Sequence, residues 1–379
     1  MTQFFENLLS ANGLLIGMIL PFLIVLTIVV FVHEMGHYLV GRWCGIGVQA
    51  FSVGLGPEIV GFTDKRGTRW KFSAIPLGGY VKFVGDMNAT STPDPDEIEK
   101  LSPEERRVAF HVQPVWKRAL TVAAGPVFNF MLTIAIFTVF IYAYGKVISE
   151  PMVARVQPNT PAAQAVFLPG DRFISIDGTP IVTFNDVRDA VLRSPGDAMT
   201  FVVRRGDRDV SLTATPVQRE IKDALGNMVK VRVIGVENDE KLGQPRRVEF
   251  SAAGALREAV SDTGAIIATT GQFLKRLVTG REDRCQLGGP IKIAKMSGQA
   301  AALGIEWVIQ LAALLSVGIG FLNLLPIPPL DGGHLAFYAI EAAMRRPVSE
   351  RAMDLVYRVG FFAVLTFMTF VFWQDIFGC

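Results

Sequence analysis

Four stretches of the chain are mainly apolar and carry no charged side chain: residues 14–32, 119–145, 307–330 and 359–374. A helix of about 20 apolar residues crosses the hydrocarbon layer of a bilayer, so the first three runs are long enough and the fourth needs its flanking turns. Four such runs rarely fit inside one soluble core, which disfavours the alternative of buried helices. The pattern therefore predicts four membrane-spanning helices, at about 14–39, 119–145, 305–326 and 355–374.

The segments between these runs have other patterns. Residues 48–85 alternate partly between apolar and polar positions and are punctuated by glycines, as β-hairpins are. Residues 150–215 combine alternating strands with the amphipathic "FNDVRDAVLRS" and a hairpin about "RRGD", which predicts a small β-rich domain. Residues 216–303 form a β and amphipathic-helical connector, whose helices either lie on the membrane surface or pack against the small domain. The two membrane halves are then 1–149 and 304–379.

The composition agrees with this organisation. Hydrophobic residues make up 50% of the chain, charged residues 19%, and the mean hydropathy is +0.36. We therefore expect a polytopic α-helical membrane protein with a water-exposed, β-rich part. The net charge of +2 is too small to indicate nucleic-acid binding. The three cysteines, Cys44, Cys285 and Cys379, form no CxxC pair, which argues against a disulfide framework and a sulfur-ligated metal.

Basic residues near the runs predict the orientation in the bilayer. Arg42, Lys117 and Arg118 border the segment between the first two runs, and several arginines lie between the third and fourth. Because basic loops stay in the cytoplasm, residues 40–118 and 331–357 face inward, and both termini and the 146–306 segment face outward. The C-terminal ends of the first and third runs consequently share one face of the membrane.

The end of the first run contains "HEMGH", which matches the pattern HExxH. On a helix, His33 and His37 lie one turn apart on one face and can bind a single Zn²⁺, with Glu34 placed to act on a water at the metal. The alternative is two histidines that simply pack near the membrane interface. Ionisable groups at the end of a membrane-spanning run are costly, which favours a functional site.

A catalytic zinc has three protein ligands, so one more ligand is needed. No His or Glu follows HExxH closely, but the end of the third run, "NLLPIPPLDGGH", meets the same face of the membrane. Its prolines must end the helix there. Asp331 then offers an oxygen ligand on an extended backbone, and His334 is the rival. His111, in a polar loop, is interpreted as a surface histidine.

Three motifs together resemble those of a known family: HExxH in the first run, "GPVFNF" (125–130) in the second and "NLLPIPPLDG" (323–332) at the end of the third. The family is the site-2 proteases, intramembrane zinc metalloproteases, and specifically the bacterial type that trims membrane-bound anti-sigma factors. The resemblance implies that His33, His37 and Asp331 bind one Zn²⁺ and that Glu34 is the catalytic base. It favours Asp331 over His334 as the third ligand.

The resemblance also implies a setting for the reaction. The protein would lie in the inner membrane of a Gram-negative-type cell and cut single-span membrane proteins that another protease has already cleaved. "PGDRFISIDG" (169–178) strongly resembles PDZ domains in proteases, whose groove binds a peptide or C-terminus by strand addition. Family members of this type often carry two PDZ domains, whereas this chain has room for one. That domain would act as a receptor or as a size filter, and a structural spacer is the alternative.

A helical substrate has to be held extended before it can be cut. In the family, a membrane-re-entrant β-loop occupies the place of residues 48–85, and its strand edges could receive an unwound substrate. An ordinary cytoplasmic hairpin is the alternative. Gly78 and Gly79 in this region, together with the amides of Asn129 and Asn323, are candidate substrate-binding residues. The two amides could instead tie helices together.

Two other classes of function fit parts of the sequence. A non-catalytic membrane scaffold could use the PDZ-like domain to bind peptides, but it has no need of Glu34 and Asp331 beside two histidines. A metal transporter should have polar residues through the depth of the membrane, and the second and fourth runs have very few.

Overall fold

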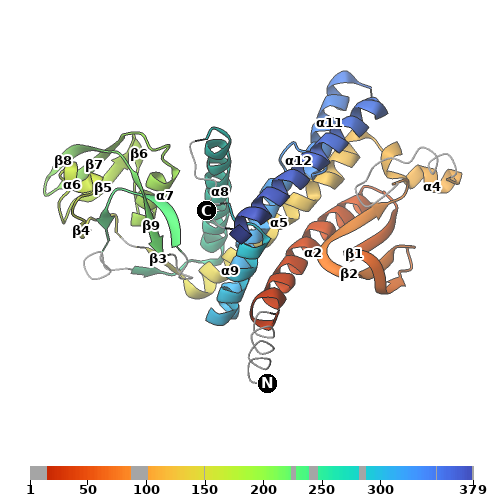
Figure 1. Ribbon diagram of the computed structural model, residues 1–379, viewed down its shortest axis with the longest axis horizontal. Coiled ribbons are helices and arrows are strands. Elements are labelled where there is room, and N and C mark those ends of the chain that lie inside the picture. Colours follow the sequence, from red (N-terminus) through yellow and green to blue (C-terminus); the bar gives the residue numbers. More distant parts are fainter. Residues whose placement is uncertain are drawn as a thin grey trace. The chain divides into compact units, whose positions relative to one another are not determined.

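The computed structural model describes residues 15–86, 101–148, 150–222, 228–238, 246–280, 287–346 and 348–377. It divides into two compact units: a helical unit formed by Met1–Phe137 and Leu287–Cys379, and a β-rich unit formed by Thr138–Gln286 (Figure 1). Cys285 and Cys379 lie outside the described residues. Cys44 is buried and free.

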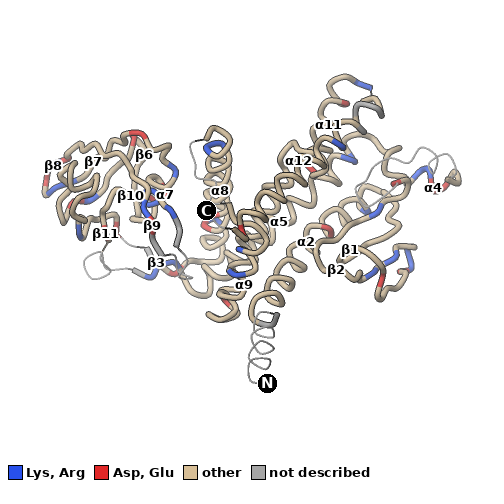
Figure 2. The backbone as a smooth tube through the Cα atoms, in the orientation of Figure 1, with Lys and Arg blue, Asp and Glu red and all other residues tan. Residues whose placement is uncertain are grey.

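Four helices are long and apolar enough to cross a membrane: Gly17–Trp43, Val115–Tyr144, Ile305–Asn323 and Leu355–Phe377. They correspond to the short π-helix η1 (Leu15–Ile19) with α2 (Leu20–Trp43), to α5 (Val115–Tyr144), to α10 (Ile305–Asn323) and to α12 (Glu350–Phe377). Figure 2 shows charged residues mainly near the ends of α2, α5 and α12. The predicted polytopic helical class with strand regions is confirmed at this level.

The apolar surface of the first span indicates what surrounds it. Leu20, Ile24 and Ile28 lie on successive turns of α2 and are 47–49% exposed. Water would make such a face costly, whereas lipid solvates it. Helix α10 ends at Asn323, three residues before the predicted end, because Pro326 and the prolines after it cannot continue a helix.

Two long strands follow the first span. β1 (Val48–Thr63) pairs antiparallel with β2 (Arg69–Phe83). Residues 50–53 of β1 pair with residues 79–82 on one side and 69–72 on the other, so residues 79–82 form an edge of this sheet within the described part of the chain. Phe51, Val81 and Phe83 are buried in one cluster with Tyr38 of α2, and this cluster holds the edge against the span.

Shorter helices complete the helical unit. They are α4 (Pro103–Val108), the 3₁₀ turn η2 (Phe110–Val112), α9 (Pro290–Leu303) and α11 (Asp331–Met344). The carboxylate of Asp375, near the end of α12, accepts hydrogen bonds from the backbone N–H groups of Gly289, Ile291 and Lys292 and so caps α9. Because α9 packs against η1, α2 and α10, it belongs to the helical unit, although the sequence places it in the connector at 216–303.

The β-rich unit is built around a four-stranded sheet in the order β6-β5-β7-β8. These strands are β6 (Thr179–Pro180), β5 (Arg172–Ile176), β7 (Met199–Arg205) and β8 (Arg208–Ala214). Two helices, α6 (Pro161–Gln164) and α7 (Phe184–Arg193), accompany the sheet. Phe173 and Phe201 of the sheet and Val187 of α7 are buried in one core.

The core of this unit extends past residue 215. Its remaining elements are β3 (Lys146–Ile148), β4 (Arg155–Val156), β9 (Val217–Lys222), β10 (Met228–Val233), β11 (Val236–Glu237), β12 (Arg246–Val248) and α8 (Ala252–Val278). Strand β11 pairs with β4, and Ile234 is buried in the same core as Phe173. The sequence predicts a boundary at 215 because the last hairpin that its local pattern indicates ends there. The pairing of β11 with β4 joins segments far apart in sequence, so the local pattern does not reveal it.

Candidate metal centre

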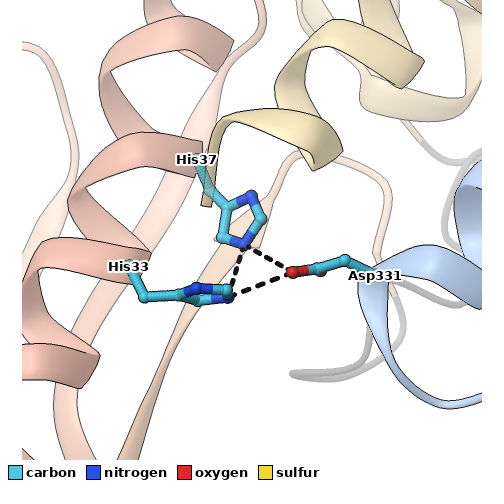
Figure 3. Close-up of side chains that lie close together, drawn as sticks. All are labelled: His33, His37 and Asp331. Atoms are coloured by element: carbon cyan, nitrogen blue, oxygen red, sulfur yellow. Dashed lines mark hydrogen bonds and ion pairs between the residues drawn. The ribbon is translucent and has the colours of Figure 1, made fainter. Parts of the chain in front are cut away.

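Two imidazoles and one carboxylate meet beside the cytoplasm-directed end predicted for the first span. His33 and His37 lie one turn apart on α2, each is 8% exposed, and their Nε2 atoms are 3.2 Å apart. Asp331 begins α11, and its Oδ2 lies 3.1 Å from His33 Nε2 and 3.5 Å from His37 Nε2. Figure 3 shows the three side chains pointing toward one another from two helices.

The chemistry of these three atoms fits a bound cation. His37 Nδ1 donates a hydrogen bond to the backbone carbonyl of Thr121 at 2.9 Å, so its Nε2 carries a lone pair when the ring is neutral. Asp331 Oδ2 is buried and has no hydrogen-bond partner among the described residues. Ligands arranged tetrahedrally at about 2.0–2.1 Å from a zinc ion lie about 3.3–3.4 Å apart, close to the separations above. The set therefore fits zinc.

Glycines bring the second span close to the two histidines. A Cβ on Gly125 of α5 would overlap the His37 ring and lie 2.8 Å from Cε1 of His33. A Cβ on Gly36 of α2 would lie 2.5 Å from the backbone oxygen of Ala124. Only glycine allows this approach of the helix backbones. In the sequence, Gly125 is notable only as part of "GPVFNF", although a glycine within an apolar run is a usable signal of close helix packing.

Replacing Gly125 with alanine is expected to displace the His37 ring and lower zinc affinity about tenfold or more. The matched control is Gly318→Ala in α10, where a new Cβ would meet nothing within 4 Å, so zinc affinity should stay at the wild-type level. Both variants are compared by competition for zinc with a chromophoric chelator. Wild-type affinity in Gly125→Ala would show that α5 does not constrain the histidine.

A cavity of about 280 Å³ opens beside the three converging groups. Its walls come from α2, β2, α5, α10, α11 and the loop before α11, and they include Glu34, Gly78, Gly79, Asn323, Asp331 and His334. Glu34 and Val81 of the sheet edge both line this cavity, and a Cβ on Gly79 would lie 3.2 Å from Glu34 Cγ. Glu34 is thus held between the two histidines and the edge strand.

Three other candidate residues have different surroundings. Asn129 does not line this cavity: it is fully buried in α5, and its amide lies 3.2 Å from His33 Nδ1. His334 shares a 2.7 Å hydrogen bond with Tyr357 of α12 and is not one of the three converging groups. His111 is not a plain surface histidine, because its Nε2 lies 2.9 Å from Oδ1 of the fully buried Asp86, which needs a partner.

Comparison with known proteins identifies the family. The model of peptidase family M50 matches residues 21–367. The chain belongs to peptidase family M50. This confirms the resemblance to site-2 proteases and the expected class, a metalloprotease, and the four apolar helices make this M50 protein a multi-pass membrane protein.

Relatives in this family are similar over nearly the whole chain. A protein of Mesorhizobium japonicum, named as a zinc metalloprotease, is 63% identical over 96% of this chain and all of its own length. Another so named, from Brucella suis, is 58% identical over 98% of each chain. Metalloprotease MmpA of Caulobacter vibrioides is 38% identical over 95% of each. These names agree with zinc as the metal.

One solved structure is similar to part of the chain. It is the PDZ domain of an SdrC-like protein from Listeria monocytogenes, which matches 26% of this chain and 96% of that domain at 21% identity. The TM-score of 0.20 is too low to establish a shared fold.

Proposed function

We propose that this M50 protein hydrolyses a peptide bond within or near the membrane-spanning segment of single-span membrane proteins, such as anti-sigma factors. The observation that carries the proposal is the convergence of His33, His37 and Asp331 beside a cavity that also contains Glu34, at the end of a membrane-spanning helix. A non-catalytic scaffold would not need a carboxylate base beside three converging metal-binding groups. A transporter needs polar groups along a path, whereas these groups gather at one end of the span.

His33, His37 and Asp331 are proposed to hold the zinc ion through Nε2, Nε2 and Oδ2. When bound, zinc polarises the scissile carbonyl and lowers the pKa of a water molecule to about 7. Glu34 accepts the proton of the attacking water and then delivers it to the leaving amine, as a general base and acid. Glu34 lines the cavity beside His33, His37 and the sheet edge, so it lies next to the space that the substrate would enter.

The edge of the sheet supplies a way to hold the substrate. Among the described residues, residues 79–82 pair with β1 on one side only, and Gly78 and Gly79 line the cavity. An unwound substrate segment would add to this edge as a further strand, so that its peptide bonds pass the catalytic groups. The absence of side chains at the two glycines lets the substrate backbone approach closely, and the amide of Asn323 at the cavity wall would hydrogen-bond it.

The proposed setting is the inner membrane, with both termini and the β-rich unit outside and the catalytic cavity toward the cytoplasm. The distribution of Arg42, Lys117, Arg118 and the arginines after α11 supports this orientation. In the β-rich unit, the "PGDRFISIDG" stretch forms β5 and its turn within the folded core. We propose that this unit contains a PDZ domain that binds a peptide or C-terminus and so selects substrates already shortened by another protease.

Metal removal tests the proposed function directly. The full chain in detergent or vesicles should cleave a single-span substrate whose outer domain has been removed. Stripping zinc with a chelator should abolish cleavage, and added Zn²⁺ should restore it. Added Mg²⁺ is the matched control and should not, because two imidazole nitrogens suit zinc and not magnesium. Cleavage that persists in verified zinc-free protein would refute the proposal.

A further inference from the structure

Helix α5 presents three positions, four residues apart, to the histidines of α2. Thr121, Gly125 and Asn129 therefore lie on one face of α5. The backbone oxygen of Thr121 accepts a hydrogen bond from His37 Nδ1, and Gly125 leaves space for both rings. Asn129, at the third position, is 0% exposed and lies 3.2 Å from His33 Nδ1. Thr121 and Asn129 on this face thus contact the Nδ1 side of each imidazole, which points away from Asp331.

Metal-binding histidines need a hydrogen-bond acceptor on that side. A neutral imidazole that binds metal through Nε2 carries its proton on Nδ1, and a carboxylate, carbonyl or amide oxygen normally accepts it. Thr121 supplies such an oxygen to His37. For His33, the hydrogen bond found at Nδ1 in the described part of the chain is the one to the Asn129 amide.

The Asn129 amide has one orientation in which its oxygen accepts the Nδ1 proton of His33. With its NH₂ group toward His33 Nδ1, its Oδ1 is buried without a hydrogen-bond partner, which is costly. A half-turn of the amide places Oδ1 beside His33 Nδ1 and the NH₂ group where Oδ1 was, without moving another atom. Oδ1 then accepts from His33 Nδ1–H, and His33 Nε2 keeps a lone pair toward Asp331 and His37.

We propose that Asn129 is the positioning residue of His33: its Oδ1 accepts the Nδ1 proton and so fixes the tautomer in which Nε2 faces the metal. This inference rests on the ligand set of the proposed function. The backbone at Asn129 is itself held in place, because its carbonyl accepts hydrogen bonds from Ser316 of α10 at 2.9 Å and from Thr133 at 3.2 Å. The amide is therefore presented to His33 in a fixed position.

Three variants of the full chain separate this role from simple helix packing. Asn129→Leu keeps the volume but removes the acceptor, and its zinc affinity should fall about tenfold to a hundredfold. Asn129→Asp keeps an acceptor at the same place, and its affinity should stay near the wild-type level. Ser316→Ala removes a contact between α10 and α5 without touching His33, so its zinc affinity should also stay unchanged.

Zinc affinity is measured by chelator competition, and the visible spectrum of the Co²⁺-substituted protein reports on the ligand geometry. Wild-type affinity in Asn129→Leu, or a loss in Asn129→Asp as large as in Asn129→Leu, would overturn the role of Asn129. If Asn129→Leu does not fold, Asn129→Asp decides alone: retained affinity and spectrum support the inference, and a tenfold loss overturns it. A wild-type protein without zinc, or Asp331→Ala with undiminished zinc, would instead refute the ligand set itself.

Discussion

Replacement of Glu34 by glutamine is expected to slow peptide-bond hydrolysis by about 10²- to 10⁴-fold, the usual contribution of a general base. Glutamine has the same shape as glutamate and can still lie beside Val81 and Gly79, but it cannot accept the proton of water. Zinc content and thermal unfolding should therefore match those of the wild type. The measurement is the rate of cleavage of a single-span substrate by purified protein, with zinc determined in the same samples.

The matched control is Glu306→Gln. It makes the same chemical change at an exposed position in the first turn of α10 and should leave the rate unchanged. An undiminished rate in Glu34→Gln would mean that another group activates the water. Loss of zinc from Glu34→Gln would indicate that Glu34 also supports the metal site. The cleavage rate would then be measured after zinc has been added back.

Replacement of Asp331 by alanine is expected to remove zinc from the purified chain and, with it, the activity. The carboxylate supplies the oxygen that converges on His33 and His37, and two imidazoles alone make a much weaker site. Zinc affinity should fall by more than the tenfold to hundredfold, or about 1.4–2.7 kcal/mol, that is lost when a hydrogen-bond partner of a metal ligand is removed. Zinc per chain, measured by atomic absorption after dialysis, reports the result.

His334→Ala is the informative comparison, because sequence alone left this residue as the rival ligand. Its ring is 8% exposed, lines the same cavity and shares its hydrogen bond with Tyr357. The variant should therefore keep its zinc. If His334→Ala lost zinc while Asp331→Ala retained it, the third ligand would be the histidine, and the convergence at Asp331 would need another explanation.

The variants of Glu34, Asp331 and Asn129 together are expected to separate three roles. Loss of the proposed base should abolish hydrolysis and leave the metal, loss of the Asp331 ligand should remove both, and loss of the Asn129 acceptor should weaken metal binding while the ligands remain. Each variant is expected to show a different combination of zinc content and cleavage rate. Measuring both quantities on each variant therefore separates the three roles.

The sequence by itself determined the features that depend on local periodicity. Four uncharged runs predict four apolar helices because a bilayer imposes a minimum length, and the protein has helices at those places. The spacing of His33 and His37 predicts their common face because a helix has 3.6 residues per turn. The prolines after Asn323 predict the end of α10, since proline cannot continue a helix.

Only the tertiary structure decided which distant groups meet. It brings Asp331 and not His334 to the two histidines, buries Asn129 against His33 away from the cavity, and pairs β11 with β4 beyond the expected boundary at 215. These contacts join residues far apart in the chain. They depend on how glycines such as Gly125 let α5 approach α2, on which sheet edge packs against Tyr38, and on where the loop after α10 turns. Such close packing follows from side-chain shape in three dimensions, which the local sequence pattern does not specify.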